Sequence, residues 1–152
     1  MVENTISVDA LIDDGSEISI MPRRVFEKLN IPIDTEINWT INTYEAVKAE
    51  ANGKGLLGVC HAVNVNVGGV AVDIPVFVVE NANSDLLLGR PWERYVEAKS
   101  DNRPDGSLWI RIQSPDGRRV AQFCAVKAEH ERNRHFARLP QEGLVGSDWG
   151  KV

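Results

Sequence analysis

Apolar and polar residues alternate with a period of two on both sides of Gly68-Gly69, and this is the clearest pattern in the chain. The apolar positions are Val63, Val65 and Val67 before the glycines and Val70, Val72, Ile74, Val76 and Val78 after them. Such alternation is typical of strands with one buried face, and two glycines suit a tight turn between them. The pattern predicts a β-hairpin.

Shorter apolar runs predict the other elements of the first hundred positions. They indicate strands at residues 5–12 and 17–21 and an extended segment at 31–37. A proline at the start of an apolar face predicts short helices at residues 22–29 and 91–98. The expected buried side chains of these helices are Val25, Phe26 and Leu29 in the first and Trp92 and Tyr95 in the second.

The last third of the chain contains a second hairpin signal. Residues 107–113 and 118–126 flank the turn sequence Ser114-Pro115-Asp116-Gly117. Residues 127–138 are charged and would suit a solvated helix. From residue 139 onward the chain lacks periodicity, and we expect a disordered tail or a linker there.

Composition narrows the class of protein. The 152-residue chain has the length of one domain, and 43% hydrophobic residues support a folded core. Its formal net charge of −5 argues against nucleic-acid binding by bulk electrostatics. The first residues form no apolar segment typical of a secretory signal or a membrane span, and two cysteines make no disulfide framework. We therefore expect an intracellular, cytoplasmic protein that binds neither nucleic acid nor membrane.

The chain contains cysteine and histidine residues, which are the usual ligands of zinc. The candidates are Cys60, His61, Cys124, His130 and His135. Their spacing matches no paired pattern of a structural zinc site, so we expect no metal and no other cofactor.

Two segments suggest chemistry. Residues 10–16 read Ala-Leu-Ile-Asp-Asp-Gly-Ser, an apolar strand that ends in an acid and turns at Gly15, so a carboxylate can stand at the floor of a cleft. Taken alone, Asp-Asp-Gly-Ser is also an ordinary turn composition. Residues 84–92 read Ser-Asp-Leu-Leu-Leu-Gly-Arg-Pro-Trp, another apolar run that ends in glycine and leads into a helix.

Together these segments resemble the retropepsins, the single-lobed aspartic proteases of retroviruses and retrotransposons. Residues 10–29 and 76–92 carry the similarity, which is closest to proteases of fungal long-terminal-repeat elements of the gypsy type. The resemblance implies an all-β fold, a single-lobed acid protease barrel with one or two short helices. It also implies an aspartic endopeptidase that cleaves a retroelement polyprotein, in the cytoplasm or in retroelement particles.

The resemblance assigns roles to individual residues. It gives the catalytic role to Asp13 and places the active-site loop at Asp14, Gly15 and Ser16. Three residues would pack beneath this loop, although ordinary strand burial would look the same there: Leu87, Leu88 and Gly89.

Further implied features lie on either side of the loop. An ion pair between Arg90 and Glu17 would fix it, unless both side chains simply face solvent. The flap, a mobile hairpin that closes over substrate, falls by position between residues 39 and 57, a stretch whose ordinary interpretation is an exposed hairpin or loop. The flap candidates are Tyr44, Asn52 and Gly53.

Aspartic proteolysis needs two carboxylates that share a proton, and one chain offers one credible acid. The other Asp-x-Gly, Asp148-Trp149-Gly150, lacks a preceding apolar strand and has a bulky residue in its middle position. The sequence therefore predicts a homodimer in which each chain contributes Asp13 across a two-fold axis. An N-terminal strand that relatives have would be short or absent here, because Met1 lies so close to Asp13.

Asp14 departs from the family pattern, because retropepsins usually have Thr or Ser at this position. Their hydroxyl bonds the partner's backbone at the dimer axis, whereas an ionised carboxylate can accept a hydrogen bond but cannot donate one. A dimer would gather Asp13 and Asp14 of both chains, and we expect repulsion to keep at least one of them protonated. The outcome is either an enzyme that prefers acid pH or a protease-shaped scaffold with little activity.

The sequence thus predicts a protease domain at residues 1–99, a C-terminal β-hairpin extension at 100–126, and a charged segment and tail at 127–152. The favoured function is homodimeric cleavage of an extended polyprotein peptide. The alternatives are a weak or inactive retropepsin-like module for dimerisation or peptide binding, and an unrelated small β-barrel with an incidental acid turn.

Overall fold

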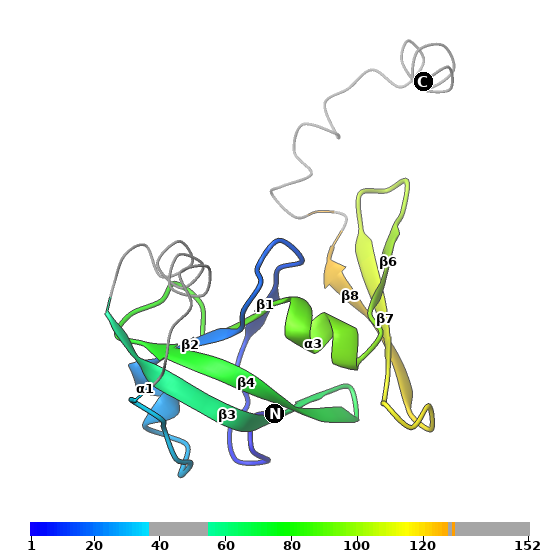
Figure 1. Ribbon diagram of the computed structural model, residues 1–152. Coiled ribbons are helices and arrows are strands. Elements are labelled where there is room, and N and C mark those ends of the chain that lie inside the picture. Colours follow the sequence, from blue (N-terminus) through cyan, green and yellow to red (C-terminus); the bar gives the residue numbers. More distant parts are fainter. Residues whose placement is uncertain (37–54, 128, 130–152) are drawn as a thin grey trace. The chain divides into compact units, whose positions relative to one another are not determined.

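The computed structural model describes residues 1–36, 55–127 and 129 (Figure 1). The strands are β1 (Ala10–Ile12), β2 (Ile20–Pro22), β3 (Leu56–Val67), β4 (Val70–Val79), β5 (Leu86–Leu88), β6 (Lys99–Asn102), β7 (Leu108–Gln113) and β8 (Val120–Val126). The helices are α1 (Arg23–Phe26) and α3 (Arg90–Tyr95). The described residues form two compact units, one from those within 1–99 and 111–122 and one from those within 100–110 and after 122.

A five-stranded sheet in the order β1-β5-β2-β4-β3 is the centre of the first unit. β1 runs parallel to β5, in a register that pairs Ile12 with Leu88. β2 runs parallel to β4 and antiparallel to β5, where Ile20 pairs with Leu87. The short strand β5 therefore lies between the two strands on either side of the Asp13 turn.

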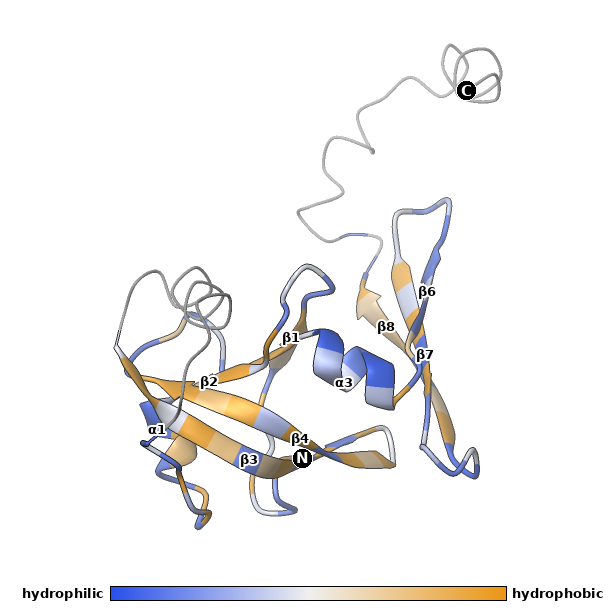
Figure 2. Cartoon of the chain, in the orientation of Figure 1, coloured by the Kyte–Doolittle hydropathy of each residue, from blue (hydrophilic) through white to orange (hydrophobic). Residues whose placement is uncertain are grey.

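The hairpin predicted around Gly68-Gly69 is confirmed as β3 and β4. Both glycines have positive φ, 60° and 91°, which is the conformation that a tight two-residue hairpin turn requires. Hydrophobic colouring extends along much of both strands in Figure 2. The alternate residues Val70, Val72, Ile74, Val76 and Val78 of β4 are all buried. Their burial makes β4 the main apolar support of the sheet.

The first strand is shorter than the sequence predicts. Residues 3–5 turn back on themselves, because Glu3 and Asn4 adopt positive φ and the Val2 N–H donates to the Ile6 carbonyl (2.9 Å). Residues before this turn pair with β3 instead, where the Asn66 N–H donates to the Met1 carbonyl (2.8 Å). The start of the chain therefore covers part of the edge of β3.

Both predicted helices form but are shorter than expected. Pro22 is the N-cap of α1, and separate turns rather than helix continue to Leu29. In α3, Trp92 is fully buried as expected, but Tyr95 is 52% exposed, so its predicted anchoring role is wrong. Neither these helices nor any other in the described residues is long and apolar enough to cross a membrane.

A separate three-stranded sheet has the order β6-β7-β8. The hairpin predicted around residues 114–117 is confirmed as β7 and β8, and its turn is closed by an N–H of Gly117 that donates to the Ser114 carbonyl (2.8 Å). β6 was not predicted, because its four residues are all charged or polar and form no apolar pattern, and all four are exposed.

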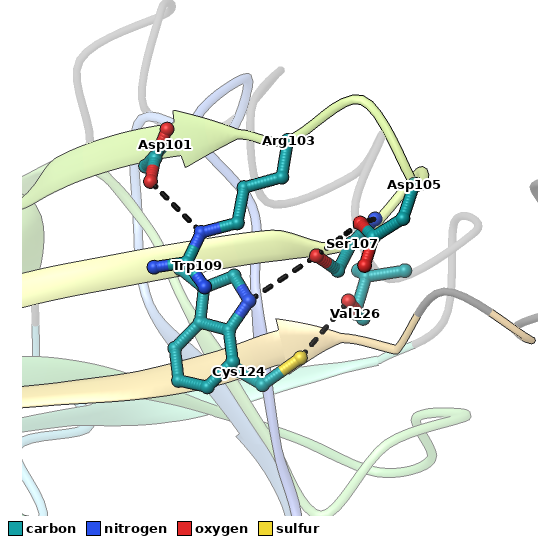
Figure 3. A network of polar contacts seen from close by, with 7 residues as sticks. All are labelled: Asp101, Arg103, Asp105, Ser107, Trp109, Cys124 and Val126. Atoms are coloured by element: carbon teal, nitrogen blue, oxygen red, sulfur yellow. Dashed lines mark hydrogen bonds and ion pairs between the residues drawn. The ribbon is translucent and has the colours of Figure 1, made fainter.

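Polar side chains order the loop between β6 and β7 (Figure 3). The Arg103 guanidinium lies 4.3 Å from the centre of the Trp109 ring, and its Nε donates to Asp101 (3.1 Å). Ser107 Oγ donates to Asp105 (2.6 Å) and accepts from the Trp109 indole N–H (3.2 Å). Each of these groups therefore has a partner in the loop or in the strand residues that adjoin it.

Candidate active site

Asp13 lies where β1 leaves the sheet. Its backbone N–H donates to the Leu88 carbonyl (2.9 Å), which extends the parallel pairing of β1 with β5 by one residue. The side chain is half-buried, while the neighbouring Asp14 is exposed. The sheet thus fixes the backbone of Asp13 and leaves its carboxylate at the surface of the chain.

The loop itself holds one oxygen of the Asp13 carboxylate. The Gly15 N–H donates to Asp13 Oδ1 (2.9 Å), and the Ser16 N–H donates to the Asp13 carbonyl (3.2 Å). A Cβ at position 15 would lie 3.2 Å from the same Oδ1, so a side chain there would crowd this bond. Within the described part of the chain, Asp13 Oδ2 makes no hydrogen bond, which leaves it available to a second group.

Ser16, at the end of the loop, is buried, and its hydroxyl bonds the backbone of Ile18. Its side chain is 1% exposed, and its Oγ donates to the Ile18 carbonyl (2.7 Å) and accepts from the Ile18 N–H (3.4 Å). A buried hydroxyl that serves two backbone groups is a structural element of the loop, because both groups would otherwise lack a partner.

Replacing Ser16 by Ala should therefore lower the free energy of unfolding by about 1–3 kcal/mol, the cost of leaving buried polar groups unpaired. Chemical denaturation of the full chain measures this effect. The matched control is Ser7→Ala, at an exposed serine, which should stay within about 0.5 kcal/mol of wild type. Equal stabilities of the two variants would contradict the role given to Ser16.

Gly89 packs directly against the loop. A Cβ at this position would lie 2.2 Å from the Ile18 carbonyl oxygen and 2.7 Å from that of Ser16, which is too close for any side chain. The Gly89 N–H donates to Ser19 Oγ (3.1 Å), and the next N–H, that of Arg90, donates to the Ser16 carbonyl (2.8 Å). The end of β5 and the active-site loop are therefore held together backbone to backbone.

The predicted ion pair between Arg90 and Glu17 is wrong. Neither side chain takes part in an ion pair among the described residues, and both are exposed. Arg90 supports the loop through its backbone N–H, while its charge favours the ionised form of Glu93, three positions along α3. The i, i+3 spacing on a helix brings these two side chains to one face.

Glu93 is the residue of this site that sequence reasoning missed. Burial raises the pKa of its carboxyl group, and the negative charges of Asp14 and Asp13 raise it further, against the opposing effect of Arg90. A third acid of the chain therefore lies within electrostatic reach of the loop. The signal was present in the sequence, because a helix that starts after Gly89 carries Glu93 in its first turn, close to the loop that Gly89 supports.

The remaining predicted site residues either lie outside the described part of the chain or are buried in β5. Tyr44, Asn52 and Gly53, the flap candidates, lie outside the described residues, as do His130 and His135. Leu87 and Leu88 are buried in β5, as both the site and the ordinary strand interpretation require.

Among the described residues, the cysteines and the histidine do not form a metal site. In residues 1–36 and 55–127, no three His, Cys, Asp or Glu side chains lie close enough to hold a metal ion. Burial raises the pKa of the Cys60 thiol to about 11, with a smaller effect from Glu3. His61 Nε2 lies 2.9 Å from Asp34 Oδ2, and this hydrogen bond is the main reason that the pKa of Asp34 is lowered.

Two surface hollows of the first unit are both lined in part by the exposed Tyr95. One has a volume of about 330 Å³ and is lined by Pro75, Pro91, Arg94 and Tyr95. The other, of about 310 Å³, is lined by Asn64, Ala71, Val72, Asp73, Tyr95 and Pro115. Neither hollow includes Asp13 or its loop, so these two hollows do not form a substrate cleft over the candidate catalytic residue.

Comparison with known proteins agrees with this arrangement. A family model described as "gag-polyprotein putative aspartyl protease" matches residues 1–92, more than half of the chain. The solved structures include a similar one, the crystal structure of the retroviral protease-like domain of Ddi1 from Leishmania major, with 22% sequence identity and a TM-score of 0.55. That match covers 79% of this chain and 87% of the other. No curated protein sequence matches the chain.

The fold class expected from the sequence is confirmed, since the structure is mostly β with short helices and is similar to a retroviral protease-like domain. The family match spans both the Asp13 loop and the β5–Gly89 segment on which that loop rests. The chain therefore belongs to the gag-polyprotein aspartyl protease family.

Proposed function

We propose that this protein is an aspartic endopeptidase that works as a homodimer, with Asp13 of each protomer in the catalytic pair. The observation that supports this most is the geometry of Asp13. Its backbone and Oδ1 are fixed by β5 and Gly15, while Oδ2 has no hydrogen bond among the described residues. A carboxylate held in this way is oriented to share a proton with a second carboxylate.

The second carboxylate would come from another copy of the chain. Asp14 follows Asp13 directly in the same loop and is exposed, so it cannot face Asp13 across a substrate as a symmetric partner. A two-fold axis beside the loop would bring the two Asp13 side chains together and build the cleft between protomers. Each protomer would then supply half of the site.

The reaction would proceed through a water molecule between the paired Asp13 groups. The ionised carboxyl takes a proton from this water, whose oxygen attacks the peptide carbonyl carbon, while the protonated carboxyl gives its proton to the carbonyl oxygen. The C–N bond of the resulting tetrahedral diol then breaks as one Asp13 carboxyl gives its proton to the nitrogen and the other takes a proton from a diol hydroxyl, and a carboxylic acid and an amine leave. The pair ends with one shared proton, as it began.

The substrate in this proposal is an extended peptide that lies as a strand across the site and has apolar side chains at the cut. The family supports a polyprotein as its source. We further propose a retrotransposon of the fungal gypsy type as the origin, and the cytoplasm or the element's particles as the place of action, on the sequence resemblance of residues 10–29 and 76–92.

A second candidate function is a non-catalytic dimerisation or peptide-binding module. The observation that favours it is the number of acids at the loop, since Asp13, Asp14 and Glu93 of each chain would approach those of its partner. Mutual repulsion of ionised carboxylates could keep the protomers apart at neutral pH. The two functions differ in whether cleavage appears as these acids gain protons.

Asp14→Thr separates the candidates. On a quenched peptide library between about pH 4 and pH 7, a range that spans carboxylate titration, wild type should show pepstatin-sensitive cleavage that is strongest at the acid end. Asp14→Thr should keep this activity and gain activity near pH 7, because it removes one negative charge per loop and restores a hydroxyl donor.

The matched control is Asp9→Thr, at an exposed acid before β1, which should leave the pH dependence unchanged. An inert wild type beside an active Asp14→Thr would support the scaffold function. Absence of pepstatin-sensitive cleavage in both proteins at every pH would contradict the proposed enzyme.

A further inference from the structure

Glu93 is attached to the active-site loop through the start of α3. The Glu93 N–H donates to the Gly89 carbonyl (3.3 Å), and Gly89 and Arg90 are bonded to Ser19 and Ser16 of the loop segment. Trp92, which precedes it, is fully buried and fixes the helix in the core. The position of the Glu93 backbone is therefore tied to the position of the loop.

One oxygen of the half-buried Glu93 carboxylate lacks a hydrogen-bond partner in the described part of the chain. Its Oε1 is buried and makes no hydrogen bond among the described residues. The charged groups that act on it are Asp14 and Asp13 from the loop and Arg90 from its own helix. A buried carboxylate oxygen with no donor is costly when it is ionised and far less so when the group is neutral.

We propose that Glu93 is a positioning residue of the active site, whose uncharged form allows the loops that carry Asp13 and Asp14 to meet in the dimer. This inference rests on the proposed function. When Glu93 ionises, each protomer places three carboxylates around one loop, and the two protomers repel each other where they must join. Glu93 acts on the reaction through Asp13 and Asp14 and does not itself touch substrate.

The sign of the pH dependence follows from the direction of the shift. The pKa of Glu93 is raised in the folded protein, so its contribution to stability is complete below the pKa of an unfolded glutamate. That contribution is lost as pH rises through the folded-state pKa, because the unfolded chain ionises more readily. Glu93 would therefore limit activity and dimerisation on the alkaline side.

Glu93→Gln tests this role, because the amide has the shape of the neutral acid and cannot ionise. We expect kcat/KM at about pH 4 to equal that of wild type, and the alkaline limb of the kcat/KM profile to move up by about one pH unit. The control is Glu27→Gln, the same change at an exposed glutamate after α1, which should leave the profile in place. Superimposable profiles of wild type and Glu93→Gln would overturn the proposal.

Sedimentation of the full chain separates this proposal from the proposed function. The dimer dissociation constant of wild type should rise with pH, and Glu93→Gln should reduce that rise whether or not peptides are cleaved. If wild type dimerises but never cleaves, the enzyme proposal fails and the dissociation constants alone decide on Glu93. An identical pH dependence in both proteins would overturn the role of Glu93 and leave the enzyme proposal standing.

A carboxyl ¹³C titration decides the case in which Glu93→Gln does not fold. In wild type, the titration midpoint of Glu93 should lie above that of an ordinary glutamate, and it should fall in Asp14→Asn, because the neighbouring charge is removed. A midpoint that does not move between the two proteins would overturn the proposed coupling between Glu93 and the loop.

Discussion

Replacing Asp13 by Asn should lower kcat/KM for peptide cleavage by about 10²–10⁴-fold, the range associated with loss of a positioned acid or base. An asparagine cannot take a proton from water, and it cannot hold the proton that the pair shares. Its Oδ1 can still accept the Gly15 N–H, so the loop should keep its shape. The loss should appear in kcat/KM at every pH, with little change in the free energy of unfolding.

The control for this variant is Asp9→Asn, the same chemical change at an exposed acid just before β1. Only the backbone N–H of Asp9 has a bond in this region, to Asp85, so its side chain should be dispensable. Initial rates of wild type, Asp13→Asn and Asp9→Asn on one peptide measure the difference. Cleavage by Asp13→Asn at the wild-type rate would remove Asp13 from the mechanism.

Replacing Gly89 by Ala should lower the free energy of unfolding by at least about 3 kcal/mol, the upper end of what overpacking usually costs. The added methyl would lie 2.2 Å from a carbonyl oxygen of Ile18 and 2.7 Å from that of Ser16. These are backbone atoms, so relief requires that the end of β5 separate from the loop. That movement would also break the Arg90 N–H bond to Ser16, so activity should fall with stability.

Gly55→Ala is the matched control, because among the described residues a Cβ there would meet only Glu80, at 3.8 Å, an ordinary contact distance. Its free energy of unfolding should stay within about 0.5 kcal/mol of wild type. Urea denaturation of the three proteins provides the comparison. A Gly89→Ala protein as stable as Gly55→Ala would contradict the backbone packing that holds the loop.

The parts of the fold that the sequence predicted correctly have local causes. Alternating valines around two glycines specify a hairpin without reference to the rest of the chain, and β3 and β4 have the expected turn. The second hairpin followed in the same way from its turn residues. The Asp13 loop and the β5–Gly89 segment were found as a pair of short motifs, and the structure brings these two segments together.

The parts that the sequence did not predict depend on tertiary contacts. β6 is formed by four exposed residues, Lys99–Asn102, whose composition does not differ from that of a loop. The start of the chain pairs with β3 because two non-glycine residues, Glu3 and Asn4, adopt positive φ, which no propensity argument anticipates.

In the site, too, features with a local cause were predictable and features that depend on tertiary contacts were not. The residues beneath the loop were predictable because close backbone packing demands glycine at position 89. The charged neighbour of Arg90 was not predictable, because Glu17 is far from it in sequence and the effect of its charge on Glu93 depends on how α3 is placed. The buried, unpaired oxygen of Glu93 likewise follows from packing of the helix and not from its local sequence.

The most direct test of the central claim is a subunit-mixing experiment. Wild-type and Asp13→Asn chains are unfolded together, refolded at a fixed total concentration and assayed on one peptide over a series of mixing ratios. If each site needs Asp13 from both protomers, a mixed dimer is inactive, and activity should fall as the square of the wild-type fraction. A fall in direct proportion to that fraction would show that one chain carries a complete site, and it would contradict the shared catalytic pair.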